Sequence, residues 1–366
     1  MKNGWRYCIG LAVLLGLFVN CQVFGEIQYN VTDLGTLGGN YSYGYGLNDS
    51  GQVTGYSYRF SGDYAHAFLY SSSVMTDLGT FGKDESYGYG INNSGQVVGG
   101  AWNVTAGGCC GYIYSNGVIT YLGTLGGHST WATSINNNGQ VTGSSYIAAG
   151  YTHAFRYTSG VMTDLGTLRS GYNSTGYGLN NNGQVTGEAD IYVGGNWYQH
   201  AFLYSNGVMT DLGTLGGLES RGTGINNSGQ VTGYACTSTG NWHAFIYSGG
   251  VMTNLGTLGG NYSYGRGINN SGQITGEAFT SASNILHAFI YSNGVMTDLN
   301  TLIDPSSGWT LSSGYGINNL GQITGYGINA QGLGHAFLLT PIPEPASTLL
   351  LIVGAGMLRR KFKSKS

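Results

Sequence analysis

The stretch INNSGQVTG at residues 225–233 decides the fold, because near-copies of it recur along the whole chain. Its core, Gly-Gln-Val/Ile-Val/Thr-Gly, occurs seven times, at spacings of 44, 44, 44, 46, 43 and 49 residues. The first glycines of the copies are Gly51, Gly95, Gly139, Gly183, Gly229, Gly272 and Gly321. Self-similarity at a period of about 20 to 50 residues is typical of a repeat architecture.

Each repeat contains four short strand-like pieces, which in the fifth copy lie at 222–226, 230–235, 243–248 and 251–256. Asn-Ser-Gly and Gly-Gly separate the first piece from the second and the third from the fourth, and both are tight-turn signals. Glycine supplies the positive φ of such turns, which explains why they recur. The 67 glycines, 8% charged residues and absence of a Gly-X-Y period exclude collagen and a charged disordered chain. The composition indicates an all-β protein.

The phase of the repeat predicts how the strands are arranged. The repeat region begins with a piece of the fourth type, at 29–39, and ends with a piece of the third type, at 335–340. The seventh sheet is therefore complete only if the first strand pairs with the last. We predict a seven-bladed β-propeller of four-stranded blades, closed by its N- and C-terminal strands, within 26–340. The alternative is a β-solenoid, which needs distinct capping repeats instead.

The third piece begins with the triplet His-Ala-Phe in six of the seven repeats. Together with INNSGQVTG and the downstream YSNGVMTDLGTLGG (204–217), the triplet resembles the HAF-repeat family of bacterial extracellular proteins. The resemblance covers nearly all of 29–340. Cys110-Gly111-Tyr112 replaces the triplet in the second repeat, and Asn300 replaces the glycine of Asp-Leu-Gly in the last copy. The resemblance implies an extracellular protein and carries over no catalytic residue.

The N-terminal segment 1–25 has the pattern of a secretory signal peptide. Lys2 and Arg6 precede an apolar run from about Cys8 to Val19, and small or apolar residues occupy a cleavage region near Gly25. A retained anchor needs a longer run, of about 20 residues. We therefore expect secretion.

The C-terminal segment 341–366 has three parts in order. Pro343, Glu344 and Pro345 precede an apolar run at 348–358, and a basic tail begins with Arg359 and Arg360. This order resembles the PEP-CTERM sorting signal of Gram-negative bacteria. The resemblance implies an exosortase as partner, a short transmembrane helix in transient membrane contact, and delivery to the cell surface or the extracellular (biofilm) matrix, where exopolysaccharide is produced. The alternative is an ordinary C-terminal membrane anchor.

The charge of the repeat region argues against nucleic-acid binding. The two ends hold seven of the 13 basic residues and one of the 16 acidic residues, which leaves six basic and 15 acidic residues and a net charge near −9. Phosphate neutralisation needs basic patches, and this region has none.

Strand alternation places the variable connections on one face of the disc, opposite the constant turns. Variable loops on a rigid scaffold commonly bind ligands. Aromatic rings beside polar side chains suit sugar rings, so we predict a ligand-binding loop face. Its residues are Trp102, Trp131, Trp197, Tyr198, Trp242 and Trp309. The alternative is that these rings only cover blade edges.

The histidines and cysteines predict no metal site and no cofactor. Six of the seven histidines begin a third piece, one per blade, so no two of them can share a zinc ion. We expect them to form structural hydrogen bonds, and the Asp of Asp-Leu-Gly to be a turn residue. Cys236 lies too far along the ring to bridge Cys109 or Cys110, so it is expected to be free. A vicinal Cys109–Cys110 disulfide is the alternative for that pair.

The leading hypothesis is a secreted, surface-sorted, non-catalytic propeller that binds exopolysaccharide or another envelope component. The first alternative is a structural or adhesive module that binds proteins. The second is a carbohydrate-active enzyme built from Glu188, Asp190, Asp63 or Glu219. No nucleophile motif or recurring carboxylate pair supports catalysis.

Overall fold

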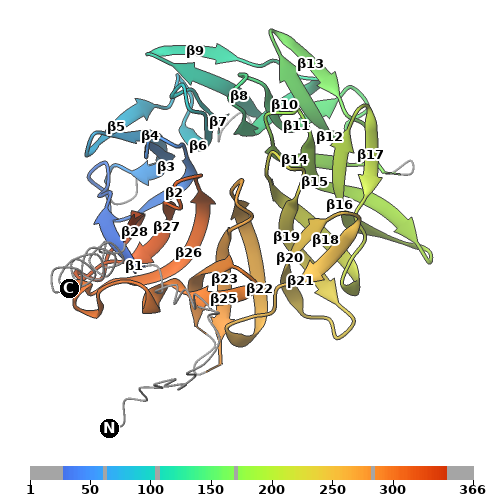
Figure 1. Ribbon diagram of the computed structural model, residues 1–366. Coiled ribbons are helices and arrows are strands. Elements are labelled where there is room, and N and C mark those ends of the chain that lie inside the picture. The colour runs from blue at the N-terminus through green and yellow to red at the C-terminus, as the bar shows by residue number, and fades with distance from the viewer. Residues whose placement is uncertain (1–27, 61–63, 104–107, 169–171, 282–284, 344–366) are drawn as a thin grey trace, which may run out of the picture. The chain divides into compact units, whose positions relative to one another are not determined.

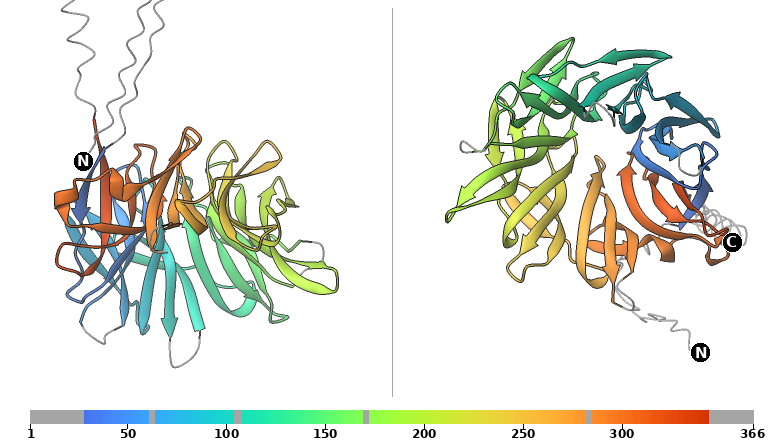
Figure 2. Two further views of the ribbon diagram at one scale, coloured as in Figure 1. Left: turned by 90° about the horizontal axis from the view of Figure 1, so that it is seen from below. Right: turned by 180° about the vertical axis from the view of Figure 1, so that it is seen from behind.

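The structure is a computed structural model that describes residues 28–60, 64–103, 108–168, 172–281 and 285–343. These residues form seven four-stranded antiparallel sheets, arranged as blades around one axis (Figure 1). Figure 2 shows the same ring from the side and from behind. The predicted seven-bladed β-propeller is confirmed, and the solenoid is excluded. The predicted signal peptide, 1–25, and residues 344–366 of the predicted sorting signal lie outside the described residues.

The strands of the first three blades follow the chain from the axis outward. Blade 1 consists of β2 (Ser42–Leu47), β3 (Val53–Tyr58), β4 (Ala65–Ser71) and β5 (Val74–Gly79). Blade 2 consists of β6 (Glu85–Ile91), β7 (Val97–Asn103), β8 (Gly108–Ser115) and β9 (Val118–Tyr121). Blade 3 consists of β10 (Gly126–Ile135), β11 (Val141–Ile147), β12 (Thr152–Thr158) and β13 (Val161–Asp164).

The next three blades repeat this order. Blade 4 consists of β14 (Ser174–Leu179), β15 (Val185–Val193), β16 (Asn196–Ser205) and β17 (Val208–Asp211). Blade 5 consists of β18 (Gly216–Ile225), β19 (Val231–Thr237), β20 (Trp242–Ser248) and β21 (Val251–Asn254). Blade 6 consists of β22 (Gly259–Ile268), β23 (Ile274–Thr280), β24 (Leu286–Ser292) and β25 (Val295–Asp298).

Blade 7 combines the two ends of the described chain. It consists of β26 (Thr310–Ile317), β27 (Ile323–Ile328), β28 (Gly334–Ile342) and β1 (Gln28–Asp33). Two short 3-10 helices, η1 (Leu299–Thr301) and η2 (Pro305–Ser307), precede this blade. No helix among the described residues is long and apolar enough to span a bilayer.

The ring closes by strand pairing, as the phase of the repeat predicts. β1 pairs antiparallel with β28, from Gln28 opposite Ile342 to Asp33 opposite Phe337. In Figure 1 the blue β1 lies beside the red β28. β28 runs to Ile342, two residues beyond the predicted end of the repeat region at 340. The last blade is therefore held by both ends of the repeat region.

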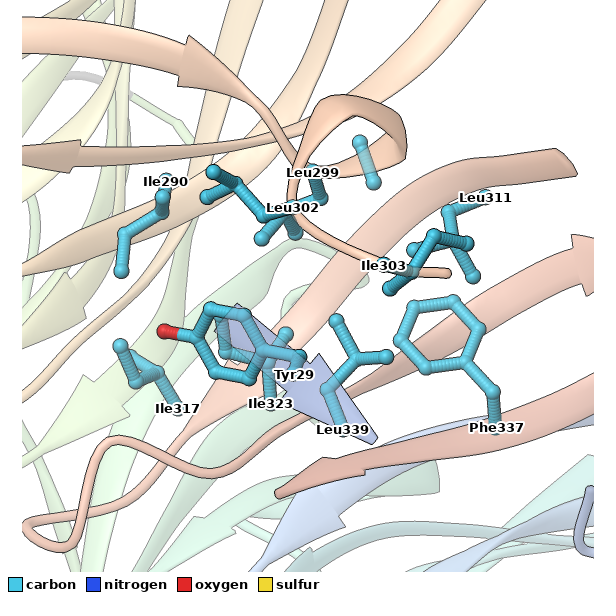
Figure 3. Close-up of a cluster of buried hydrophobic side chains, with 11 residues drawn as sticks. Tyr29, Ile290, Leu299, Leu302, Ile303, Leu311, Ile317, Ile323, Phe337 and Leu339 are labelled. Carbon is cyan, nitrogen blue, oxygen red and sulfur yellow. The ribbon is translucent and has the colours of Figure 1, made fainter. Parts of the chain in front are cut away.

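A hydrophobic cluster reinforces the closure (Figure 3). Tyr29 of β1 is 2% exposed and packs among Leu299, Leu302, Ile303 and Leu339. Its backbone N–H also donates to the Leu302 carbonyl, at 2.8 Å. Full burial of an apolar side chain of this size contributes about 1.5 to 3 kcal/mol. The first strand is thus fixed by packing as well as by its hydrogen-bond ladder.

Each blade has an aromatic residue at the centre of its third strand. These fully buried residues are Phe68, Tyr112, Phe155, Phe202, Phe245, Phe289 and Phe337. In blade 2 the residue is Tyr112, whose hydroxyl donates to the Tyr87 carbonyl at 2.9 Å. The departure from His-Ala-Phe therefore preserves the core and satisfies the added hydroxyl.

The asparagine that follows Ile/Leu in each repeat links its blade to the next one. In blade 5 the Asn226 Nδ2 donates to the Asn269 carbonyl of blade 6, at 3.1 Å. The last link runs from Asn318 Nδ2 to the Asn48 carbonyl, at 3.0 Å, and joins residues 270 positions apart. The seven residues, named here the Asn ring, are Asn48, Asn92, Asn136, Asn180, Asn226, Asn269 and Asn318.

The same asparagine also shapes its own turn. The Asn226 Oδ1 accepts from the backbone N–H groups of Ser228 and Gln230, at 3.1 and 3.0 Å. Its Nδ2 donates to the Gln230 Oε1, at 2.7 Å. The following residues form a second closed ring, in which each backbone N–H donates to the next side-chain Oδ1. These residues are Asp49, Asn93, Asn137, Asn181, Asn227, Asn270 and Asn319.

The two glycines of the repeated core have different structural roles. Gly229 ends the turn with a φ of +76°, a conformation that L side chains rarely adopt. A Cβ at Gly233 would lie 1.8 Å from the Arg221 carbonyl oxygen on the neighbouring strand. The near-invariant INNSGQVTG motif is therefore explained by turn geometry, close strand approach and blade linkage.

Candidate functional site

The axis of the ring encloses a cavity whose lining varies from blade to blade. The innermost strands follow Ser/Thr-x-Gly-x-Gly-Ile/Leu, with Ala132 and Ser134 at the glycine positions of blade 3. The second variable position lines a cavity of about 840 Å³ in every blade. These residues are Tyr45, Tyr89, Thr133, Tyr177, Thr223, Arg266 and Tyr315. The constant positions thus build the ring, and the variable ones face its interior.

One wall of the axial cavity is aromatic and spans blades 7, 1, 2 and 3. The ring centroid of Tyr45 lies 4.7 Å from that of Tyr315 and 5.4 Å from that of Tyr89. Tyr89 lies 5.6 Å from Trp131. Burial raises the pKa of Tyr45 and of Tyr89 well above the usual range, so these phenols stay protonated and neutral at physiological pH. This wall offers π faces and hydroxyl groups to a ligand.

The opposite wall, in blades 4 to 6, carries two ion pairs in which the glutamates are buried and the arginines are partly exposed. Arg221 of blade 5 pairs with Glu188 of blade 4, and Arg266 pairs with Glu277 within blade 6. Burial raises the pKa of the Glu188 carboxyl; the Arg221 guanidinium and a hydrogen bond from Tyr177 offset this rise only in part. The pairing nearly cancels charge on this wall.

A second aromatic cluster lies away from the axis, on blades 3 and 4. Tyr151 stacks on Tyr172 with centroids 4.8 Å apart, Tyr172 lies 4.9 Å from Trp197, and Trp197 lies 5.0 Å from Tyr192. Their exposed fractions are 41% for Tyr151, 45% for Tyr172, 57% for Tyr192 and 44% for Trp197. We call these four residues the aromatic platform. Contiguous exposed aromatic surface of this kind commonly marks a binding site.

Hydrogen bonds beneath the aromatic platform fix its segments to one another. The Asn173 backbone N–H and Nδ2 donate to the Asp190 Oδ2, at 3.0 and 2.8 Å. The Thr152 backbone N–H and Oγ1 donate in turn to the Asn173 Oδ1, both at 3.1 Å. Because these three residues adjoin Tyr151, Tyr172 and the strand of Tyr192, the rings are positioned before any ligand arrives.

The predicted ligand-binding tryptophans do not form one surface. Trp197 belongs to the aromatic platform, and Tyr198 follows it on β16. Trp131 lines the axial cavity, and Trp102 packs edge-to-face against it with centroids 6.4 Å apart. Trp242 contacts Tyr234, and Trp309 packs against the closure core.

The prediction that these residues lie in loops is wrong for most of them. Trp102, Trp131, Trp197, Tyr198 and Trp242 lie within strands. The reason is that the hydrogen-bond ladders continue past the repeated motif. In blade 4, for example, pairing runs out to Val193 opposite Asn196. Trp309 precedes β26 and is half-buried, so it supports the core instead of a surface.

Each histidine that begins a third piece forms a hydrogen bond with the Asp, or in one blade the Asn, that precedes Leu in the fourth piece of the same blade. The His66 Nδ1 lies 3.0 Å from the Asp77 Oδ1, and it donates because a carboxylate can only accept. The Asp77 Oδ1 also accepts from the Gly79 N–H, at 2.7 Å. The other pairs are His153–Asp164, His200–Asp211, His287–Asp298, His335–Asp33 and His243–Asn254. The expected structural hydrogen bonds and the turn role of the aspartate are confirmed.

No cluster of three or more His, Cys, Asp or Glu side chains that could hold a metal ion occurs in the described ranges. Cys109, Cys110 and Cys236 are free thiols. The expectation for Cys236 is therefore confirmed, and the alternative vicinal disulfide of Cys109–Cys110 is not formed. Burial raises the pKa of the Cys109 thiol well above its usual range, which disfavours its reactive thiolate form.

The carboxylates considered for catalysis are scattered or engaged. Glu188 is paired with Arg221, and Asp190 accepts the hydrogen bonds of Asn173. Glu219 lies on β18, and Asp63 lies outside the described residues. The described geometry does not assemble these residues into one acid–base site.

Comparison with known proteins finds the fold and no family. No family model matches the chain, and no curated protein matches it. A solved structure of YCF48 bound to D1 peptide matches with a TM-score of 0.50 and 10% identity, over 87% of this chain and 97% of that one. TolB from Acinetobacter baumannii matches with a TM-score of 0.42 and 11% identity, over 76% of each chain.

An enzyme also matches in part. The acylaminoacyl peptidase from Pyrococcus horikoshii matches with a TM-score of 0.49 and 9% identity, over 85% of this chain and 54% of the peptidase. At these identities the likenesses show the fold alone. The functional argument therefore depends on the residues of this chain.

Sequence reasoning missed the axial cavity. It took the constant positions of each repeat as the informative ones and searched the connections for a ligand site. The signal was present in the innermost strands, where the same position is Tyr45, Thr133, Tyr177 or Arg266 between unchanging neighbours. A position that varies inside an otherwise constant strand carries a side chain that the fold does not require, and such a side chain is free to contact a ligand.

Proposed function

We propose that this protein is a non-catalytic binding module that holds exopolysaccharide, or another envelope carbohydrate, outside the producing cell. The observation that carries the proposal is the aromatic platform, in which four rings from blades 3 and 4 are contiguous and exposed. Sugar rings present C–H faces that pack on aromatic rings, while their hydroxyl groups need nearby polar partners. The platform supplies both, because the phenol groups of three tyrosines lie on it.

The proposed location outside the cell is based on the two ends of the chain. A signal peptide at 1–25 and a PEP-CTERM signal at 341–366, read by an exosortase, would deliver the protein to the surface or matrix of a Gram-negative cell. The net charge near −9 of the repeat region favours a neutral polysaccharide over a strongly acidic one.

Glycan binding is tested by affinity electrophoresis of the purified protein in gels that contain exopolysaccharide from the producing strain. We expect saturable retardation, and a loss of affinity of roughly tenfold in Trp197→Ala, because removal of a large interface aromatic typically costs 1.4 kcal/mol or more. Tyr41→Ala is the matched control, since Tyr41 is 48% exposed but lies outside the aromatic platform. Equal retardation of both variants and the wild type would reject the platform as the site.

The second candidate function is peptide binding. YCF48 was solved with a bound peptide and has the same fold. Arg221 and Arg266 line the axial cavity and offer guanidinium N–H donors to the carbonyl and carboxylate groups of a peptide. Retardation by no envelope glycan, together with capture of an envelope protein that Arg221→Ala abolishes, would favour this candidate.

A further inference from the structure

A smaller, shallow pocket that is open to solvent lies beside the aromatic wall, between blades 1, 2 and 3. Its volume is about 430 Å³. Among the described residues, six aromatic rings and the carboxylate of Glu85 line it. The rings belong to Tyr45, Tyr56, Tyr87, Tyr89, Trp102 and Trp131. We call this pocket and its lining the aromatic cage.

The rings of the aromatic cage hold one another in place. Tyr45 lies 5.4 Å from Tyr89 and 5.8 Å from Tyr56, and Tyr89 lies 5.6 Å from Trp131. Trp131 in turn meets Trp102 at 6.4 Å, in an edge-to-face arrangement. Because five strands of three blades carry these rings, the cage is rigid before a ligand binds.

The charge of the aromatic cage is negative. Glu85 accepts a hydrogen bond of 2.6 Å from the Tyr87 hydroxyl, which orients its carboxylate beside the rings. Aromatic faces add the negative lobes of their quadrupoles. The two guanidinium groups at the axis, Arg221 and Arg266, belong to blades 5 and 6 and are neutralised by Glu188 and Glu277. None of the described residues that line the aromatic cage is basic.

We propose that the aromatic cage binds the trimethylammonium group of a small cationic ligand of the choline type. A cation that lies against aromatic faces is attracted to their quadrupoles, and an adjacent carboxylate strengthens the attraction. A trimethylammonium carries its charge on methyl groups that pack on ring faces, and it has no N–H group that needs an acceptor. Six aromatic rings beside one carboxylate suit such a group, although the four phenol oxygens also offer acceptors, so the selectivity over a primary ammonium rests on the ring faces. This site is independent of the aromatic platform and of the glycan proposal.

The test compares choline with its neutral isostere, in which a tert-butyl group replaces the trimethylammonium. Titration calorimetry on the purified full-length chain is expected to show choline binding at millimolar or better affinity, and at least tenfold weaker binding of the isostere. Trp131→Ala should abolish choline binding, Trp131→Phe should retain part of it, and Glu85→Gln should weaken it several-fold. Trp197→Ala is the matched control and should bind choline like the wild type.

The outcomes separate the alternatives. Equal binding of choline and the isostere would show an apolar site with no preference for charge and would overturn the proposal. Absence of choline binding up to about 10 mM would overturn it as well. Trp131→Phe keeps a ring in place and should retain part of the choline binding. If the thermal unfolding midpoints of Trp131→Phe and Trp131→Ala both equal that of the wild type, misfolding is excluded as the cause of the lost binding in Trp131→Ala. Failure of the glycan assay leaves this result unaffected, since the two assays use different residues.

Discussion

Removal of one side chain from the Asn ring should destabilise the whole propeller. Asn226 is 3% exposed and makes four hydrogen bonds, two as acceptor and two as donor. A typical intramolecular hydrogen bond contributes about 1 kcal/mol net, and buried partners left unsatisfied add to the cost. We therefore expect Asn226→Ala to lower the free energy of unfolding by roughly 3 to 4 kcal/mol.

Asn226→Asp makes the argument more specific, because the two side chains have nearly the same shape. The carboxylate can still accept from Ser228 and Gln230, but it cannot donate to Gln230 Oε1 or to the Asn269 carbonyl. At neutral pH it instead places a buried negative charge against two oxygen atoms. We expect a loss at least as large as that of Asn226→Ala.

The assay is urea unfolding, monitored by tryptophan fluorescence. Variants are compared only if the slope of the unfolding free energy against urea concentration equals that of the wild type. The matched control is Asn227→Ala, which changes the exposed neighbour and removes one hydrogen bond, from the Asn181 N–H. That control should cost about 0.5 to 1 kcal/mol. The reasoning is refuted if Asn226→Ala unfolds within about 1 kcal/mol of the wild type, or if the control costs as much.

Three further predictions concern closure, close packing and acid. Tyr29→Ala should cost about 3 kcal/mol or more in the same unfolding assay, whereas Tyr29→Phe should be neutral or stabilising, because the buried hydroxyl has no partner in the described structure. Gly233→Ala should yield no folded protein on expression and circular dichroism, since its Cβ would meet a backbone oxygen at 1.8 Å, whereas Gly108→Ala, whose Cβ would meet no described heavy atom nearer than 3.8 Å, should fold. Partial burial raises the pKa of Asp49, but hydrogen bonds from its ring neighbours outweigh this and hold it below 3.8. The lowered pKa of Asp49 thus stabilises the fold at neutral pH, and this contribution is lost as the pH falls below the ordinary value of 3.8. Asp49→Asn should therefore lose less stability than the wild type on acidification below about pH 3.8; equal acid sensitivity would contradict this.

The fold could be predicted because the same turn and strand motif occurs seven times in the sequence. The recurring turn glycines fix where strands begin and end, and the offset between 29–39 and 335–340 requires the first strand to meet the last. The structural role of the histidines followed from their occurrence once per blade. Which residue each histidine contacts could be known only from the strand register: the partner is 11 residues away in five pairs, as in His66–Asp77, and 302 positions away in His335–Asp33.

The site could be predicted only in part. Trp197 lies on an exposed aromatic surface, as expected, yet Tyr172 joins it from another blade connection and no sequence pattern pairs the two. Trp131 was placed in a loop but lines the axis, because β10 extends to Gly126. Local periodicity determines strands, whereas the grouping of side chains from different blades depends on blade packing.

The measurement that tests the central claim most directly is hydroxyl-radical footprinting of the purified protein with exopolysaccharide from the producing strain. The account predicts protection of Tyr151, Tyr172, Tyr192 and Trp197, which are exposed in the free protein, and no change at the exposed Tyr41. Absence of protection on the aromatic platform, in the presence of demonstrable binding, would contradict the account and place the glycan elsewhere on the propeller.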